Sequence, residues 1–519
     1  MTIIGRSLAR KALRSVKTVN PLFQKDVIRH PRLKSSAAAT AAVLEDVFHG
    51  IQLDTSKPIR LHKLEDILGD TSKAVDVRRR LIAEDNENAR SVLKLPAAEG
   101  DFATDEFYNK VHGANCENVV GYLPVPVGVI GPLRVNDEEF YVPMATTEGA
   151  LLASASRGAR AIEKSGGAYA KVMRDSMTRS PVVELPTAMA AIEFAQYIED
   201  PQNLETFKGY FSNTTNFGRL EDIKATVAGR YCFLRMSAST GDAMGMNMVG
   251  KGCNEILENV LRDVPSAKLV ALSSNMCTDK KPSAMNWVNG RGKSVVCEVT
   301  IPKDVVENVL KTTIPDLVKV NTIKNLVGSS LSGSIGGNNA HSSNLVTAFF
   351  IATGQDPAQN VVSSNCMVIM EPLNDSTELH VSVTMPSIEV GTVGGGTSLH
   401  SQKACLSMLG VAGASRENPG ENSKKLAEIL SATVLAGELS LNAALASNNL
   451  ISAHMDLNRK PASAESQSTN ESPQNSVTST KSSFSQNTQV RSLFSLSKRK
   501  KSISVDSNGQ FLDPQLPVP

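Results

Sequence analysis

Asn118-Val-Val-Gly-Tyr-Leu-Pro-Val-Pro-Val-Gly-Val-Ile-Gly-Pro-Leu133 is the stretch of this 519-residue chain that most clearly separates its parts. Proline and glycine interrupt its hydrophobic residues too often for a helix. The pattern predicts short buried strands joined by turns. We therefore expect a large mixed domain to begin here, at residue 117.

The segments on either side of this stretch have helical patterns. In residues 61–90, charged and apolar residues alternate at helical spacing, which predicts a small helical domain. Residues 146–163 are rich in alanine and are followed by Gly166-Gly167, which predicts a helix that starts near Thr147.

A second unit follows in residues 181–271. Amphipathic helical runs at 188–197 and 252–264 alternate with strand-like runs at 230–236 and 268–272. This alternation predicts a compact α/β sandwich inserted into the larger domain.

The two ends of the chain differ from its middle. Residues 1–44 carry nine basic residues and one acidic residue, a composition typical of an organelle transit peptide, a linker or a juxtamembrane segment alike. A long helix is predicted at about residues 435–450, and from Pro461 onward serine, threonine, asparagine and glutamine dominate, which predicts disorder. The predicted division is a basic segment (1–44), a helical domain (45–116), a large domain (117–180 and 272–459), an inserted domain (181–271) and a tail (460–519).

Charge and cysteine content exclude several classes of protein. The chain has 54 basic and 52 acidic residues, a net charge of +2, which argues against a dedicated nucleic-acid binder. Residues 45–458 carry 37 basic and 47 acidic residues, so an anionic ligand there must be held by local cations.

The seven scattered cysteines have no metal-type spacing, which predicts a reduced, cytoplasmic protein with no metal. With no run of 18 apolar residues, we expect no transmembrane span.

Two glycine-rich segments are candidates for ligand binding. Asp242-Ala-Met-Gly-Met-Asn247 and Gly391-Thr-Val-Gly-Gly-Gly-Thr397 each precede a helical run, where backbone amides can receive a phosphate. Neither has the Gly-x-Gly-x-x-Gly fingerprint of the common dinucleotide fold. Each alone is also compatible with a structural turn.

Several polar residues have a structural reading beside a functional one. Lys280-Lys281 before Pro282 is typical of a solvated turn, and Glu148 is placed like a helix cap. Asp356 lies in a turn, and His454 follows a long helix, where a histidine often pairs with the helix dipole.

Taken together and in this order, the motifs resemble one family. Glu117-Asn-Val-Val-Gly-Tyr-Leu-Pro-Val-Pro-Val-Gly, Met144-Ala-Thr-Thr-Glu-Gly149, Asp242–Asn247, Asp279-Lys-Lys-Pro282, Gly354-Gln-Asp356 and Gly391–Thr397 are similar to the catalytic region of 3-hydroxy-3-methylglutaryl-coenzyme A reductase of the eukaryotic type. The resemblance covers about residues 60–459. It implies an α+β fold with a large mixed helical and sheet substrate-binding domain, an inserted small ferredoxin-like cofactor domain and a small helical N-terminal domain.

The resemblance also implies a reaction and its residues. The family reduces hydroxymethylglutaryl-CoA to mevalonate and free CoA with two NADPH, a step of isoprenoid and sterol biosynthesis. Lys280 matches the cation beside the developing oxyanion and Asp356 its carboxylate partner. Glu148 matches the acid that protonates the reduced oxygen, for which burial and the nearby Asp356 are expected to raise its pKa. His454 matches the residue that protonates the CoA thiolate.

Binding residues carry over in the same way. The implied substrate and CoA contacts are Arg179, Ser273, Lys281, Lys324, Asn344, Arg157 and Arg160. The implied NADPH contacts are Asp242, Met244, Met246, Asn247, Val393, Gly394, Gly395, Asn458 and Arg459.

The resemblance further implies how the chain assembles and where it works. Family members are homo-oligomers, typically tetramers, that share active sites between subunits and use the Asn118 segment at the dimer interface. Most are endoplasmic reticulum proteins whose N-terminal membrane region is absent here, so this chain is expected to be either a soluble form or a truncated product.

The sequence departs from the family pattern at two functional positions. Ala150 stands where many members have cysteine. Thr215-Asn216-Phe217 replaces a Ser-Arg-Phe contact near the cofactor 2′-phosphate, which leaves the preference for NADPH over NADH open. Two other functions are kept beside the reductase: a catalytically silent CoA- or nucleotide-binding module, and an NAD-dependent oxidation of mevalonate.

Overall fold

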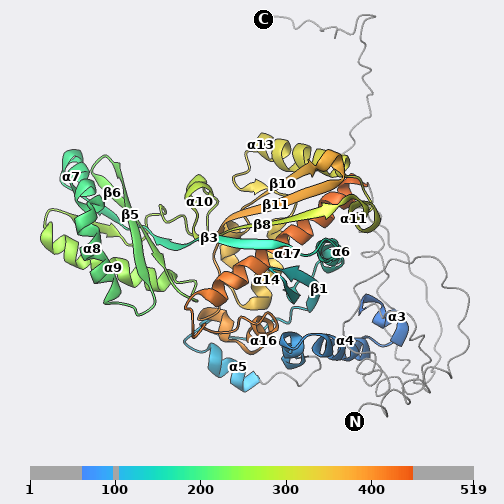
Figure 1. Cartoon of the computed structure of the whole chain (residues 1–519). Coiled ribbons are helices and arrows are strands. Elements are labelled where there is room, and N and C mark those ends of the chain that lie inside the picture. The colour runs from blue at the N-terminus through green and yellow to red at the C-terminus, as the bar shows by residue number, and fades with distance from the viewer. Residues whose placement is uncertain (1–60, 97–103, 448–519) are drawn as a thin grey trace, which may run out of the picture. The chain divides into compact units, whose positions relative to one another are not determined.

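The N-terminal helices are the first part of the chain that the computed structural model describes, and the described residues are 61–96 and 104–447 (Figure 1). Asp70 caps α4 by accepting a hydrogen bond from the Lys73 amide at 3.0 Å. This confirms the helical pattern of residues 61–90. The helices are α3 (Leu64–Leu68), α4 (Thr71–Asp85), a 3₁₀ segment (Asn88–Lys94) and α5 (Thr104–Val111).

A nine-stranded sheet runs through most of the described chain. Its order is β7-β4-β6-β3-β8-β11-β10-β9, with β5 paired to β6. Beside it lies a two-stranded antiparallel ribbon of β1 (Val127–Val135) and β2 (Glu138–Ala145). The sheet strands are β3 (Tyr169–Arg179), β4 (Val182–Glu184), β5 (Arg219–Ala228), β6 (Tyr231–Ser239), β7 (Lys268–Ala271), β8 (Gly292–Pro302), β9 (Gly337–Asn338), β10 (Cys366–Leu373) and β11 (Glu378–Ile388).

The strand β3 joins two hydrophobic cores. Its residues Tyr169 to Ser176 pair with β8, whereas Met177 to Arg179 pair with β6 (Figure 1). One core lies on the β8 side and the other on the β6 side. The change of partner falls between Ser176 and Met177, and Arg179 lies on the β6 side of it.

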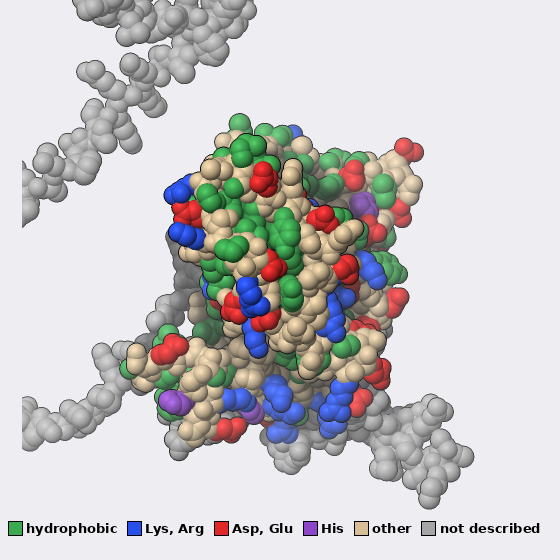
Figure 2. All heavy atoms as spheres, turned by 90° about the vertical axis from the view of Figure 1, so that its left-hand side faces the viewer, with side chains coloured by type: hydrophobic (Ala, Val, Ile, Leu, Met, Phe, Trp, Pro, Cys, Tyr) green, Lys and Arg blue, Asp and Glu red, His purple; other side chains and the backbone are tan. Residues whose placement is uncertain are grey.

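The β6 side has the ferredoxin-like topology. Chain order is β4, α7 (Ala188–Glu199), α8 (Pro201–Ser212), β5, β6, α9 (Met246–Asp263) and β7, and the sheet order β7-β4-β6-β5 is antiparallel throughout. This confirms the expected fold class, while the residue limits of the domains stay a prediction. Acidic and basic side chains are interspersed on the outer face of this part (Figure 2).

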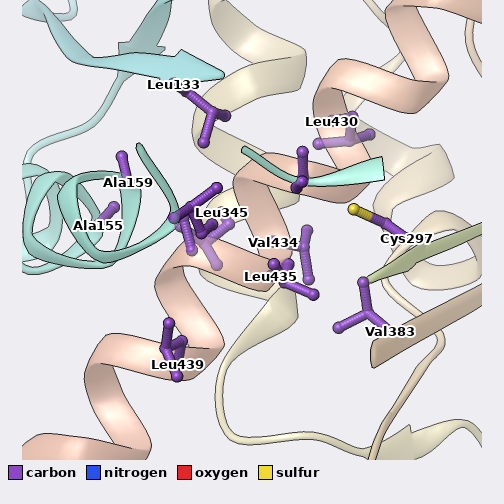
Figure 3. Close-up of a cluster of buried hydrophobic side chains, with 14 of the residues drawn as sticks. Leu133, Ala155, Ala159, Cys297, Leu345, Val383, Leu430, Val434, Leu435 and Leu439 are labelled. Atoms are coloured by element: carbon purple, nitrogen blue, oxygen red, sulfur yellow. The ribbon is translucent and has the colours of Figure 1, made fainter. Parts of the chain in front are cut away.

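The other core surrounds α17 (Glu421–Ala446). Leu430, Val434 and Leu435 of this helix lie among side chains of β8, β11 and α14 (Figure 3). α6 (Leu151–Lys164) approaches so closely that a Cβ on Gly158 would lie 1.8 Å from the carbonyl oxygen of Ala436. Among the described helices α17 alone is long and apolar enough to cross a membrane, but 78% of its apolar window is buried in the fold.

The remaining helices cover the sheet and link its strands. They are α10 (Ala284–Asn289), α11 (Lys303–Val305), α12 (Ile314–Val320), α13 (Ser329–Leu331), α14 (Ser342–Thr353), α15 (Asn360–Ser363) and α16 (His400–Met408), with π-helical turns at Val306–Leu310 and Asn321–Gly328 and 3₁₀ turns at Pro357–Gln359 and Gly395–Ser398.

Three local expectations were wrong. Residues 118–126 form no strand and are mostly exposed, because no neighbouring strand pairs with them until β1 begins at Val127. α6 starts at Leu151 rather than near Thr147, after Ala150 has adopted a φ of 72°. α17 starts at Glu421, well before the expected residue 435.

Candidate active site

Lys280 and Asp356 form the ion pair that the sequence led us to expect. The ammonium Nζ lies 2.8 Å from Oδ2 of Asp356, and both side chains are about one-third or more exposed. The other carboxylate oxygen of Asp356 accepts the Ala358 amide at 3.1 Å, as the cap of a short 3₁₀ turn. Asp356 is thus fixed at its own turn while it holds the lysine.

Glu148 and Asn344 are joined by a hydrogen bond between their side chains. Nδ2 of Asn344, in α14, donates to Oε1 of Glu148 at 3.3 Å, and Glu148 lies in the turn between β2 and α6. The structure therefore brings a candidate proton donor and a candidate substrate contact together. The burial expected for Glu148 is not found, because its turn is exposed in the single chain.

The two glycine-rich segments lie side by side. Ala243 and Val393 form a parallel bridge, and the Thr392 amide donates to the Asp242 carbonyl at 2.8 Å. A Cβ on Gly391 would lie 2.4 Å from the Met244 nitrogen, so this approach requires glycine.

Two glutamines connect these segments to the ion pair. Gln355, next to Asp356, accepts the Gly391 amide at 2.9 Å and donates to the Gly391 carbonyl at 3.0 Å. Gln359 donates both to Sδ of Met246 at 3.2 Å and to Oδ1 of Asp279 at 2.8 Å. The motifs at Asp242, Lys280, Asp356 and Gly391 therefore meet in one place.

Parts of both glycine-rich segments leave the backbone open to a ligand. Gly394 and Gly395 have positive φ angles, and nothing lies within 4 Å of where their Cβ atoms would be. A backbone without side chains and without close neighbours lets a ligand approach the amides. Gly245 leads directly into the N-terminus of α9, where backbone amides suit a phosphate.

Asp242 has a structural role that the sequence analysis did not anticipate. Its carboxylate is buried and accepts the amides of Ser415, Gly420 and Ser423 at 2.9–3.0 Å. These amides lie before and within the first turn of α17. The side chain of Asp242 is thus occupied by the protein, and its main chain faces the second glycine segment.

The remaining candidate anion contacts are placed differently from one another. Lys281 and Lys324 are exposed, Arg179 is half-buried, and the hydroxyl of Ser273 lies 3.3 Å from Sγ of Cys277. Arg157 donates to the Ser440 carbonyl at 2.7 Å and to its hydroxyl at 3.0 Å, and burial lowers the pKa of Arg157.

Arg160, on the same helix as Arg157, is only 8% exposed. Contacts of Arg157 and Arg160 with CoA phosphates stay a prediction. Met244 and Met246 are half-buried and Asn247 is exposed. His454, Asn458 and Arg459 lie outside the described residues.

The sequence analysis missed a buried charged group next to this site. Asp279, Arg291 and Glu389 form two ion pairs, with Arg291 between the carboxylates. Asp279 belongs to a motif that was noted for its lysines, whereas Arg291 and Glu389 carried no local signal because their partners are far apart in sequence.

Comparison with known proteins identifies one family. The family model described as hydroxymethylglutaryl-coenzyme A reductase matches residues 74–459. A 3-hydroxy-3-methylglutaryl-coenzyme A reductase of Zea mays is 50% identical over 427 residues, covering 82% of this chain and 72% of the relative, and reductase 1 of Oryza sativa subsp. japonica is 52% identical over 398 residues, covering 77% and 73%. The fold resembles the NADPH-bound class II reductase of Streptococcus pneumoniae, with a TM-score of 0.57, 18% identity, and coverage of 75% of this chain and all of the other.

Proposed function

The chain belongs to the hydroxymethylglutaryl-coenzyme A reductase family, and we propose that Glu148, Lys280, Asp356 and His454 carry its reaction. The enzyme reduces 3-hydroxy-3-methylglutaryl-CoA to mevalonate and free CoA with two NADPH. In balance, one C–S bond is broken, two C–H bonds form on the thioester carbon, and two protons are taken up, one by the oxygen and one by the thiolate.

Lys280 stabilises the charge that develops on the carbonyl oxygen. A fixed ammonium beside an oxyanion lowers the barrier most where it needs no rearrangement. The 2.8 Å contact with Asp356 supports this role, because it keeps the lysine in one orientation. This contact, in a site that also holds both glycine segments, is the observation on which the assignment rests.

Two residues move protons in this scheme. Glu148 protonates the reduced oxygen, and Asn344 orients its carboxyl group through the 3.3 Å hydrogen bond. His454 protonates the CoA thiolate, a role that rests on the family resemblance. An imidazole has an ordinary pKa of about 6.5, which suits proton transfer near neutral pH.

NADPH, when bound, supplies the two hydrides. The main chain of residues 242–247 and Val393, Gly394 and Gly395 holds it, together with Asn458 and Arg459. Phe217 lies beside Gly241, 62% exposed, in the segment where the family's arginine is replaced. We expect this segment to set the ratio of rates with NADPH and NADH.

Arg179, Lys281 and Lys324 hold the hydroxymethylglutaryl carboxylate in this scheme, with Ser273 and Asn344 as polar neighbours. Because the middle of the chain has a net negative charge, these local cations are needed to attract an anionic substrate. Arg157 and Arg160 serve the CoA phosphates only if they exchange their present contacts for the ligand.

The enzyme acts as a homo-oligomer with shared sites. Glu148 is exposed in the single chain, whereas an acid that donates near neutral pH is usually shielded from water. A neighbouring subunit that covers the turn of Glu148 would provide this shielding. The seven cysteines are free thiols, which supports a reducing location such as the cytosol.

Substitution of Lys280 tests the assignment. Lys280→Ala should lower kcat at least about 100-fold, because the charge that stabilises the oxyanion is lost. Turnover is measured as NADPH oxidised per hydroxymethylglutaryl-CoA, with two expected for wild type. Lys208→Met removes a lysine from an exposed ion pair on α8 and should leave kcat unchanged. A kcat of Lys280→Ala near that of wild type would refute the role.

A further inference from the structure

The buried Arg291 contacts three separate parts of the site. Its Nε donates to the hydroxyl of Thr178 at 3.1 Å and its Nη2 to the Thr178 carbonyl at 3.3 Å. Its Nη1 lies 3.1 Å from Oδ1 of Asp279 and 2.5 Å from Oε1 of Glu389. The side chains of Arg291 and Glu389 have no exposed surface.

Each of these partners adjoins a residue of the proposed site. Thr178 precedes Arg179, Asp279 precedes Lys280, and Glu389 lies two residues before Gly391. One guanidinium group therefore links the end of β3, the turn that contains Lys280 and the residues just before the second glycine-rich segment. Five N–H donors in a rigid plane allow arginine to make such contacts at once, which lysine cannot do.

The backbone around Arg291 is itself fixed. Gly290 and Gly292 both have a φ of 72°, and Cβ atoms on them would lie 2.8 Å from the Pro386 carbonyl and 2.5 Å from the Ile388 carbonyl. The start of β8 is thus packed backbone against backbone on the end of β11. The backbone that carries Arg291 is therefore held in place.

Lys280 needs such support because of its own backbone. Its φ of 55° is in the left-handed region, where a side chain other than glycine is strained. In the adjoining Asp279, Oδ1 accepts hydrogen bonds from both Arg291, at 3.1 Å, and Gln359, at 2.8 Å. In addition, Nζ of Lys281 donates to the Asp279 carbonyl at 3.3 Å.

We propose that Arg291, paired with Glu389, is a positioning residue for the Lys280 ammonium. This inference rests on the function proposed above. It concerns a residue that supports a ligand-contacting residue and does not itself contact the ligands. Arg291 fixes Asp279, and thereby the strained turn that presents Lys280 to Asp356. Glu389 keeps Arg291 neutralised and in place.

The charge on Glu389 makes this support depend on pH. The pKa of Glu389 is raised to about 7, mainly by burial and also by the carboxylates of Asp279 and Asp356, while the guanidinium of Arg291 lowers it. Arg235 of β6 also faces Arg291 and repels it. Neither oxygen of Glu389 has a well-aligned hydrogen bond among the described residues, so its pairing with Arg291 is mainly one of charge.

Two variants and one control test the proposal. Arg291→Lys should lower kcat about 100-fold, the loss expected for an ångström-scale displacement, and leave the KM for hydroxymethylglutaryl-CoA within about threefold. Lys293→Met removes a second buried basic side chain, two residues after Arg291 in β8, which pairs with Asp175, and should keep kcat within about twofold. Circular dichroism and NADPH fluorescence check the fold and cofactor binding of each variant.

Glu389→Gln provides the measurement that a merely structural role would not affect. At about pH 5.5 wild-type Glu389 is protonated and resembles glutamine, so the two kcat values should agree. At about pH 8.5 the wild-type carboxylate is charged, and the variant should be about 10-fold slower. A wild-type-to-variant ratio that is the same at both pH values would overturn the proposal, as would an Arg291→Lys kcat within about threefold of wild type. Absence of turnover in wild type would instead contradict the proposed function.

Discussion

Glu389 is unusual among the acidic residues that the structure describes, because it is completely buried and shares its arginine with a second carboxylate. Its folded-state pKa of about 7 lies above the ordinary value of 4.5. The folded protein therefore holds a proton that the unfolded chain releases between these values, and each pH unit in this range costs about 1.4 kcal/mol of stability. Stability from this residue is present at low pH and is lost as pH rises toward 7.

This sign leads to a prediction about thermal stability. Between about pH 5.5 and 8, wild type should lose about 2 kcal/mol of stability relative to Glu389→Gln, which cannot ionise. The measurement is the difference in melting temperature between the two proteins at each pH. The melting temperature of wild type should fall relative to that of the variant as pH rises. A constant difference across this range would contradict the raised pKa.

At the scale of single elements, Asp242 determines how α17 begins. Three amides converge on its carboxylate, and α17 forms the centre of the larger core. Asp242 therefore connects the predicted cofactor segment to the main helix of the fold. Its position in the motif is explained by this structural contact as well as by ligand binding.

Removal of this carboxylate should destabilise the fold. Asp242→Ala leaves three amides without their acceptor, and we expect a loss of about 3 kcal/mol in the free energy of unfolding. Asp242→Asn keeps an acceptor oxygen and should lose less. Denaturant unfolding followed by circular dichroism measures both. If Asp242→Ala weakens NADPH binding without any loss of stability, the carboxylate acts on the cofactor and not on α17.

The individual elements differ in how well the sequence predicted them. Helices and strands with regular periodicity, such as α7 and β6, were located from their patterns. The Lys280–Asp356 pair was expected from the family resemblance. The start of α17 was missed because its first turns are fixed by Asp242, far away in sequence. Arg291 and Glu389 were missed for the same reason, since a buried ion pair between strands leaves no local pattern.

For the whole molecule, the notable surface is the segment before β1. Residues 118–126 have no strand partner, and Val120 and Leu123 are 103% and 91% exposed. Neighbouring apolar side chains in this state are costly in water and typical of an interface. Sequence patterning led us to expect burial here, and burial by a second copy would satisfy that expectation.

Disruption of this segment should therefore affect both assembly and activity. Val120→Glu combined with Leu123→Glu places two charges in the proposed interface, where their desolvation is unfavourable, so the oligomer should dissociate. Light scattering after size-exclusion chromatography measures the mass.

Met189→Glu, at a 64% exposed apolar residue of α7, is the matched control and should leave the mass unchanged. In the proposed oligomer a neighbouring subunit covers Glu148, so kcat should fall together with the mass. An intact oligomer in the double variant would place the interface elsewhere, and a fully active monomer would show that Glu148 works without a neighbour.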